Sequence, residues 1–204
     1  TTFFIEDPEG NWFQAVQDDY ILIDEGKEFG GVIGCMIGVK DMDGARKVYS
    51  DLLGYNKVIY NEYGHFDDLS WMAGGNGEFR RTLVCRPDKA TGAFSPLLPT
   101  GYIELVQCRD REPRRIFEGR YWGDPGFIQI CFDVSNMNDL GKYCAEHGHP
   151  FTVDSCPDGN EFDMGEASGH FTYIEDPDGT LIEFVETHKV PVAAKLGLYI
   201  DLNK

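Results

Sequence analysis

Hydrophobic and polar residues alternate on both sides of a tight turn near the C-terminal end of the sequence. The turn is Asp176-Pro-Asp-Gly179, in which Pro177 fixes φ at the second position and Gly179 accepts a positive φ. The alternation has the period of two that a β-strand requires. We therefore expect a β-hairpin, and we expect Glu175 to pair with Thr180 across the turn.

This expected register decides which side chains share a face of the hairpin. It places Thr172 opposite Glu183, with His170 two positions further along the same face. Glu183 stands among apolar neighbours, and a carboxylate in such surroundings needs a cation, a hydrogen-bond donor or water. We expect His170 and Thr172 to contact a substrate beside Glu183, and a supporting or surface position is the alternative for His170.

Two further segments have the period of an amphipathic helix. Apolar residues recur at three- and four-residue intervals in 45–53 and in 140–147, and Gly54 and Gly148 end these segments. Asp41 or Asp43 is expected to cap the first helix. Strands are expected at 31–39, 57–60, 79–86 and 102–108, and a loop is expected at 87–100.

Parts of this pattern recur along the chain. Residues 31–42 match residues 126–137 at an offset of 95, and 102–106 echoes 181–185 at an offset of 79. Residues 4–10 repeat 173–179, so the sequence opens with the end of a further copy. Short repeats that cannot each bury their apolar faces are expected to pack side by side into a shared sheet.

The repeats divide the chain into six parts. They are the terminal hairpin of a truncated upstream βαβββ module (1–20), a linker (21–30), a first βαβββ module (31–108), an arginine-rich connector (109–125), a second βαβββ module (126–188) and a C-terminal tail (189–204). Either an upstream unit is missing, or the first strands complete the sheet of another chain. A lone two-stranded hairpin is marginally stable, so it should pack on the following unit or on another chain.

Composition and charge narrow the range of partners. The chain has 204 residues and a net charge of −17, which would repel nucleic acid and anionic membranes. No apolar run approaches the roughly 18 residues that a membrane span needs. The six cysteines include no CxxC pair, which is typical of a reducing compartment, so we expect a cytoplasmic protein that acts on a small molecule.

Two motifs carry a resemblance to a known family. They are Gly38-Val-Lys-Asp-Met-Asp43, which continues into Ala45-Arg-Lys-Val-Tyr-Ser-Asp-Leu-Leu-Gly-Tyr55, and Glu175-Asp-Pro-Asp-Gly-Thr-Leu-Ile-Glu183. Over residues 31–188 the chain resembles the vicinal oxygen chelate superfamily, which includes glyoxalase I, extradiol dioxygenases and the bleomycin-resistance proteins. The resemblance implies an α+β fold in which tandem βαβββ modules pair into an open eight-stranded, cup-shaped sheet with the helices outside.

The resemblance also implies a set of metal ligands. In that family a divalent metal lies on the floor of the cup, bound by a His or Gln from each module's first strand and a Glu from each last strand. The matching positions here are Gln129 and Glu183 in the second module and Glu104 in the first, whereas Gly34 offers no ligand atom. Such a set suits Mg²⁺ or Mn²⁺, and it could hold Zn²⁺, Ni²⁺ or Fe²⁺ less well than imidazole ligands would. The alternative is that no metal binds.

Two functions follow from the resemblance. The first is a glyoxalase-like, metal-dependent lyase or isomerase acting on a small oxygenated carbonyl or acid, with Glu104 or Glu183 as the catalytic residue that moves a proton. The alternative is a metal-free small-molecule binding or sequestration protein of the bleomycin-resistance type, in which these glutamates pair with arginines such as Arg80 or Arg81. Which modules pair is left open, and one arrangement is a homodimer.

The connector is locally basic in an acidic chain. Its segment 109–120 reads RDREPRRIFEGR. Its arginines either pair with surface carboxylates or contact an anionic substrate, because arginine binds carboxylates bidentately.

Overall fold

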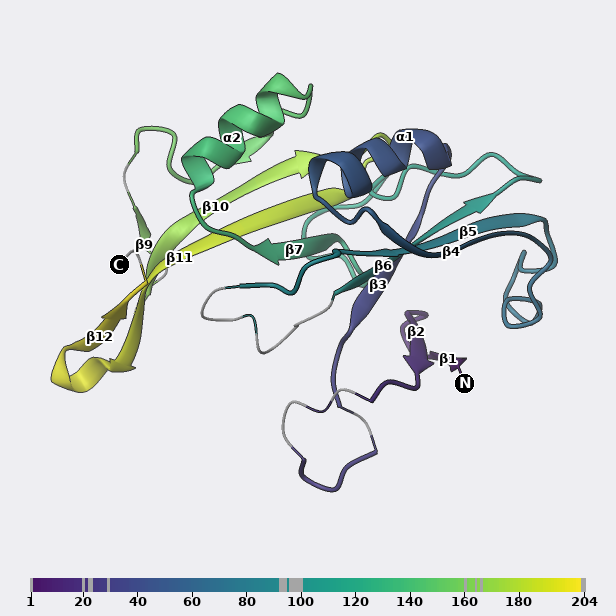
Figure 1. The fold of residues 1–204 in the computed structure, drawn as a ribbon, viewed down its shortest axis with the longest axis horizontal. Coiled ribbons are helices and arrows are strands. Elements are labelled where there is room, and N and C mark those ends of the chain that lie inside the picture. Colours follow the sequence, from purple (N-terminus) through teal and green to yellow (C-terminus); the bar gives the residue numbers. More distant parts are fainter. Residues whose placement is uncertain are drawn as a thin grey trace. The chain divides into compact units, whose positions relative to one another are not determined.

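The computed structural model describes residues 2–19, 21, 24–28, 30–91, 95, 101–159, 161–163, 165 and 167–202. The chain forms two compact units, Thr1–Ile128 and Gln129–Lys204, each with its own sheet (Figure 1). Most of the predicted loop 87–100, and parts of the predicted linker 21–30, lie outside the described residues.

The first unit contains a four-stranded sheet. Its strands are β3 (Gly34–Gly38), β4 (Lys57–Gly64), β5 (Phe79–Cys85) and β6 (Tyr102–Cys108), in the spatial order β3-β6-β5-β4. β3 runs parallel to β6, and the other pairs are antiparallel. All four predicted strands are present. β4 runs beyond its predicted end because it stays paired with β5 as far as Gly64.

One helical segment covers one face of this sheet. It consists of α1 (Met42–Arg46) and a π-helical continuation, η1 (Lys47–Leu52). The Asp41 carboxylate accepts hydrogen bonds from the backbone amides of Asp43 and Gly44, both at 3.1 Å, so the predicted cap is confirmed. Gly54 follows the segment with a φ of +79°, a conformation that glycine adopts without strain.

The helical segment packs on apolar side chains. The predicted helix stripe is buried except for Leu53, which is half-buried. The sheet face under it carries Ile37, Val84, Ile103 and Leu105, each exposed by 5% or less. An ion pair between Arg80 and Asp43 of α1, 3.1 Å long, marks this face as the helix side. Because side chains alternate along a strand, Arg81 and its neighbours lie on the opposite face.

A separate hairpin precedes this sheet. β1 (Thr2–Glu6) and β2 (Trp12–Val16) pair only with each other among the described strands. Trp12 and Phe4 contact Trp71, with ring centroids 4.8 and 6.2 Å apart. The hairpin therefore packs against the loop between β4 and β5, within the first unit. Such packing was expected because a lone two-stranded hairpin is only marginally stable.

The second unit contains a six-stranded sheet. Its elements are β7 (Gln129–Asp133), α2 (Met137–Glu146), β8 (Val153–Asp154), β9 (Phe162–Asp163), β10 (Ser168–Glu175), β11 (Leu181–Ala193), the 3₁₀-turn η2 (Ala194–Leu196) and β12 (Leu198–Asp201). β7 runs parallel to β11, which pairs with β10, which pairs with β8. This order and sense are those of β3, β6, β5 and β4 in the first unit.

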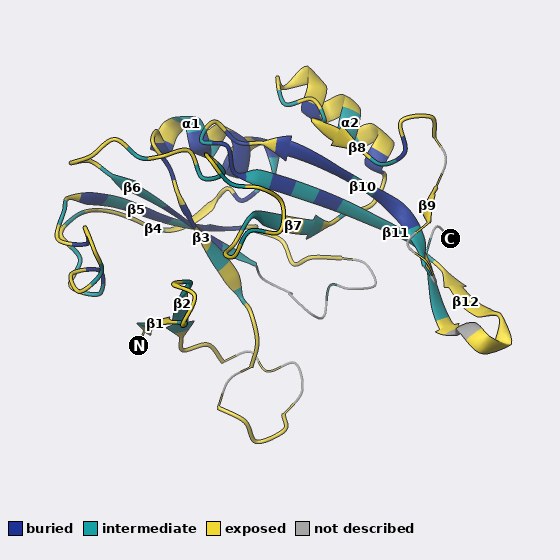
Figure 2. Cartoon of the chain, turned by 180° about the vertical axis from the view of Figure 1, so that it is seen from behind, coloured by how far each residue is buried: buried dark blue, intermediate teal, exposed yellow. Residues whose placement is uncertain are grey.

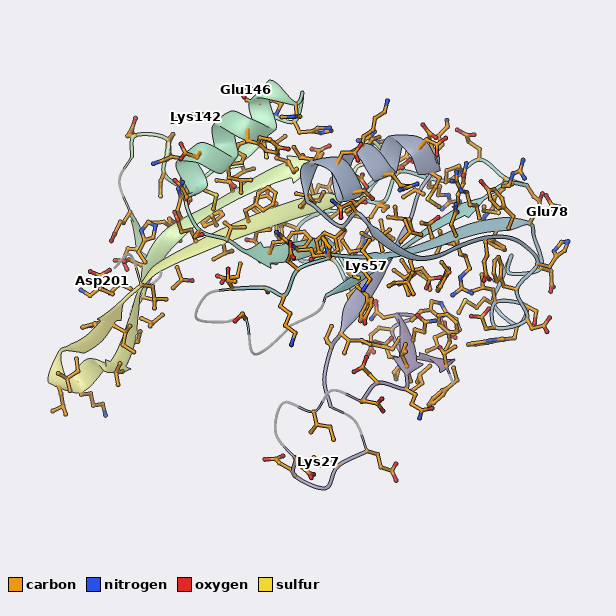
Figure 3. All side chains as sticks on the ribbon, viewed as in Figure 1. Lys27, Lys57, Glu78, Lys142, Glu146 and Asp201 are labelled. Carbon is orange, nitrogen blue, oxygen red and sulfur yellow. The ribbon has the colours of Figure 1, made fainter. Side chains whose placement is uncertain are left out.

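The helix α2 covers one face of the second sheet. Met137 and Cys144 are buried, whereas Tyr143 is 40% exposed, so the predicted apolar stripe is only partly covered. Lys142 and Glu146 are exposed and lie on the outer side of the helix (Figure 3). The face beneath α2 contains the fully buried Ile174, Ile182 and Phe184. Figure 2 shows long buried stretches on β10.

The register of the hairpin β10–β11 differs from the prediction by one residue. Glu175 pairs with Leu181 rather than with Thr180, so Glu183 faces Tyr173 rather than Thr172. The cause is a longer turn, because the Asp176 carboxylate accepts hydrogen bonds from the amides of Asp178 (2.9 Å) and Thr180 (2.8 Å). A shift of one residue moves each side chain to the other face of the sheet relative to its partner.

The ends of the second unit also differ from the prediction. Residues 189–193 continue β11, and residues 198–201 form β12 beside it, where a tail was predicted. The fold is α+β, as predicted. The described strands form a two-stranded, a four-stranded and a six-stranded sheet, so the single eight-stranded cup is not confirmed and stays a prediction. Within the described residues, no helix combines the length and apolarity that a membrane crossing requires.

Candidate functional site

Glu104 lies in the middle of β6, on the sheet face away from α1. It pairs with Leu83 of β5 and with Met36 of β3, and it is 3% exposed. Its Oε1 accepts hydrogen bonds from Arg81 Nε and from the Tyr60 hydroxyl, both at 2.5 Å. The carboxylate is therefore already neutralised by a cation within its own unit.

Arg81 connects Glu104 to a second carboxylate. Its Nη1 donates to both oxygens of Asp68, at 2.8 Å each, and the guanidinium lies 4.9 Å from the ring centroid of Phe66. Burial works to lower the pKa of Arg81, but the hydrogen bonds to Glu104 and Asp68 outweigh it and raise the pKa. Arg81 therefore stays charged and ties the loop between β4 and β5 to the sheet.

Gly34 occupies the position at which the family places a first-strand ligand. A Cβ built on Gly34 would lie 2.3 Å from the carbonyl oxygen of Tyr102, which is its partner residue on β6. That contact is far inside van der Waals distance, so no side chain fits there unless the backbone moves. The close pairing of β3 with β6 thus requires a glycine at position 34, and a glycine has no side chain with which to bind a metal.

The second unit brings together Gln129 of β7, Tyr173 of β10 and Glu183 of β11. Glu183 Oε1 accepts a hydrogen bond from the Tyr173 hydroxyl at 2.8 Å, and Oε2 accepts one from Gln129 Nε2. The Tyr173 oxygen also lies 3.1 Å from Gln129 Oε1. We call these three side chains the Gln129–Tyr173–Glu183 group. It satisfies both carboxylate oxygens of Glu183 with neutral donors.

His170 and Thr172 lie on the other face of the second sheet. Thr172 is fully buried and donates to the sulfur of Met137 at 3.5 Å. His170 is 7% exposed, and its Nε2 lies 2.7 Å from an oxygen of Asp154. The prediction that these two residues share a face with Glu183 is wrong, because it followed from the predicted register. The reason for expecting them beside a substrate is therefore lost.

Sequence reasoning found some of these contacts and missed others. It placed Gln129 next to Glu183, and this contact is present. It offered Arg80 or Arg81 as partners of Glu104 and Glu183, and of these pairs the structure shows Arg81 with Glu104. It missed Tyr173, which the unexpected turn brings opposite Glu183. The signal for Arg81 was present, since a charged residue on the apolar strand β5 needs a buried counter-charge.

The residues at the family's four metal-ligand positions, Gly34, Glu104, Gln129 and Glu183, do not form a suitable set of ligands in this chain. Gly34 has no room for a ligand, and Arg81 already holds Glu104. The two remaining residues, Gln129 and Glu183, supply only one carboxylate between them. No group of three or more His, Cys, Asp or Glu residues in the described part of the chain is arranged to hold an ion. A cation at Glu104 would have to displace a buried guanidinium, which is costly.

The tyrosines beside the two glutamates predict a pH dependence of stability. Burial raises the pKa values of Tyr60 and Tyr173 above the ordinary 10.0, and hydrogen bonds to Glu104 and Glu183 raise them further. A raised pKa means that folding favours the neutral phenol, so this stability is complete below pH 10 and is lost as the pH rises through the folded-state pKa.

We expect the free energy of unfolding to fall as the pH is raised above 10. The double variant Tyr60→Phe/Tyr173→Phe should show a shallower fall, because it has lost both of these ionisations. Urea unfolding at several pH values measures this slope. Tyr121→Phe is the control, since Tyr121 is 80% exposed and its variant should keep the wild-type slope. Equal slopes in all three proteins would contradict the prediction.

Comparisons with known proteins agree on one family. The family described as the Glyoxalase/Bleomycin resistance protein/Dioxygenase superfamily matches residues 32–184. A glyoxalase family protein from Bacillus cereus is similar in structure, with a TM-score of 0.58 and 14% identity over 81% of this chain and 99% of that one. A glyoxylase/bleomycin resistance protein/dioxygenase domain from Frankia sp. EAN1pec has a TM-score of 0.52 and 18% identity, over 78% and 99%. No curated protein matches the sequence.

Proposed function

The chain belongs to the Glyoxalase/Bleomycin resistance protein/Dioxygenase superfamily, and we propose that within it this chain binds a small organic molecule without the help of a metal. The observation that carries the proposal is the pairing of Glu104 with Arg81 at 2.5 Å. This ion pair occupies the Glu104 carboxylate, which a metal-dependent member of the family would need as a metal ligand. The closed position at Gly34 removes a second ligand.

The Gln129–Tyr173–Glu183 group supports this function by offering polar anchors on one face. It combines a carboxylate, an amide and a phenol, so it suits a ligand that carries a hydrogen-bond donor or a positive charge. Phe171 lies on the same face, with its ring centroid 6.3 Å from that of Tyr173 and 4.9 Å from that of Phe162. An apolar surface beside a few polar groups is typical of small-molecule sites.

A second candidate is the metal-dependent lyase or isomerase. It is favoured by the direct contact of Gln129 with Glu183, because two ligand-type side chains already meet there. This candidate requires further ligands and a divalent ion with measurable affinity. Metal content therefore separates the two functions.

We expect the purified protein to contain far less than one divalent ion per chain after incubation with Mg²⁺, Mn²⁺, Zn²⁺, Ni²⁺ or Fe²⁺ and gel filtration. Elemental analysis measures this content. Glu183→Gln and Glu104→Gln should leave it unchanged, as should the control Glu146→Gln on the exposed side of α2. One ion per chain that disappears in Glu183→Gln would overturn the proposal in favour of the metal-dependent enzyme.

A second experiment tests directly whether the Gln129–Tyr173–Glu183 group binds a small molecule. A panel of small aromatic amines is titrated against the protein, and the heat of binding is followed to saturation by calorimetry. Tyr173→Phe and Glu183→Gln should each weaken binding by about tenfold, which is the effect of losing one hydrogen bond to a charged or buried group. Glu146→Gln should bind as the wild type does. Saturable binding that neither site variant weakens would contradict the assignment of the site.

A further inference from the structure

A cleft of about 530 Å³ lies at one end of the first unit's sheet. It is located where β3 and β6 end and β5 begins. Glu78, which directly precedes β5, shows this end of the sheet in Figure 3. The connector after β6 forms its other wall through residues 111–114 and Ile116. All of its lining residues belong to the first unit, so the cleft is a feature of that unit alone.

The sheet side of the cleft is apolar. Phe79 and Val39 line it and are 5% and 2% exposed, and Val106 lies between them in the sheet. Pro113 and Ile116 face them from the connector. A ligand in the cleft would therefore bury hydrocarbon against hydrocarbon on both sides.

The outer part of the cleft is positively charged. Arg111 and Arg114 line it, and within the described part of the chain neither guanidinium has a hydrogen bond or an ion pair. Glu112 is the other charged residue in the lining, and its carboxylate pairs with Lys40. In a chain of net charge −17, carboxylates far outnumber the cations that could pair with them, so two arginines without such a partner are unusual.

The loop between β4 and β5 lies close to one of these arginines. Nη1 of Arg111 lies 2.8 Å from the point that a Cβ on Gly74 would occupy, so the guanidinium is in close contact with the backbone there. Gly74 has a φ of +80°, and the absence of a side chain leaves the room that Arg111 uses. The Arg111 guanidinium, which belongs to the connector, therefore lies beside the loop between β4 and β5 as well.

We propose that this cleft binds a small amphipathic monocarboxylate, with its hydrocarbon part between Phe79 and Ile116 and its carboxylate at Arg111 and Arg114. Arginine binds a carboxylate through two parallel hydrogen bonds, and the apolar walls exclude water from the hydrocarbon. The site is independent of the Gln129–Tyr173–Glu183 group, which belongs to the second unit, and it does not rest on the proposed function.

The test is calorimetric titration of the whole chain with octanoate. We expect saturable binding that weakens when the salt concentration is raised, because both arginines are exposed to solvent. Hexanoate and butanoate should bind more weakly, by about fourfold for each buried CH₂ group that is removed. Octanol should bind less tightly than octanoate, since it has no charge for the arginines.

Variants locate the site. Arg111→Gln and Arg114→Gln should each raise the octanoate Kd by about tenfold. Arg115→Gln is the matched control, since it removes the same charge from an adjacent residue that does not line the cleft, and it should bind as the wild type does. Absence of octanoate binding, or equal weakening in all three variants, would overturn the proposal.

Cys108 provides an independent readout, because its side chain lines the cleft. Octanoate should slow the labelling of Cys108 by a maleimide, as followed by peptide mass spectrometry, and this protection should be lost in Arg114→Gln. Binding without protection of Cys108 would place octanoate elsewhere and would also overturn the proposal. Neither result depends on the outcome of the metal and amine titrations of the second unit.

Discussion

Replacing Arg81 by methionine is expected to lower the free energy of unfolding by about 3–5 kcal/mol, because it leaves two carboxylates without their cation. Glu104 is 3% exposed and cannot be solvated where it lies. Asp68 loses both of its 2.8 Å hydrogen bonds to the guanidinium. Urea unfolding at neutral pH measures the loss.

Two variants test whether the loss comes from the buried charge. Arg80→Met removes an arginine from the next position on β5, but its partner Asp43 has a side chain that is 79% exposed, so we expect a loss of about 1 kcal/mol or less. Arg81→Met/Glu104→Gln removes both charges of the buried pair and should recover part of the stability lost by Arg81→Met alone. If Arg81→Met and Arg80→Met lower the free energy of unfolding by the same amount, Glu104 is not a buried, ion-paired carboxylate.

Gly34→Ala is expected to lower the free energy of unfolding by about 1–3 kcal/mol, the usual cost of forcing an extra group into a packed site. The new Cβ would lie 2.3 Å from the Tyr102 carbonyl oxygen, and relief requires β3 to move away from β6. Such a movement would weaken the parallel pairing on which the edge of the sheet depends.

Gly38→Ala is a control on the same strand and the same face. A Cβ on Gly38 meets nothing within 4 Å, so this variant should stay within about 0.5 kcal/mol of the wild type. The same steric reason predicts that Gly34→Gln will not create a fourth metal ligand. If Gly34→Ala and Gly38→Ala are equally stable, the close approach of β3 to Tyr102 is not a constraint on this position.

Sequence patterns predicted the helices and the strands of the first unit because their signals are local. The helix cap at Asp41, the helix ends at Gly54 and Gly148, and the strands of the first unit each depend on neighbouring residues. The family was also predicted, since its motifs are short and continuous, and the family match over residues 32–184 confirms it.

The parts that were missed depend on details that a pattern does not contain. The hairpin register depended on the length of the turn, in which the Asp176 carboxylate accepts hydrogen bonds from the amides of Asp178 and Thr180. Leu53 donates to the carbonyl of Val48, five residues earlier, as in a π-helix, and the apolar spacing of the segment gave no sign of this. Whether Arg80 or Arg81 would meet Glu104 followed only from the face that α1 covers.

The parallel pairing of β7 with β11 has a consequence for the order in which the second unit folds. The hairpin β10–β11 joins neighbouring segments, so Tyr173 and Glu183 meet after closure of a short loop. The Gln129–Glu183 hydrogen bond joins residues that are 54 positions apart, with α2 and the strands β8, β9 and β10 between them in the sequence. Because distant contacts carry a larger loop-closure entropy, we expect β7 to dock late and Gln129 to complete the group last. Intermediates in which β7 has not docked would therefore expose the edge of β11 to pairing with other chains during synthesis.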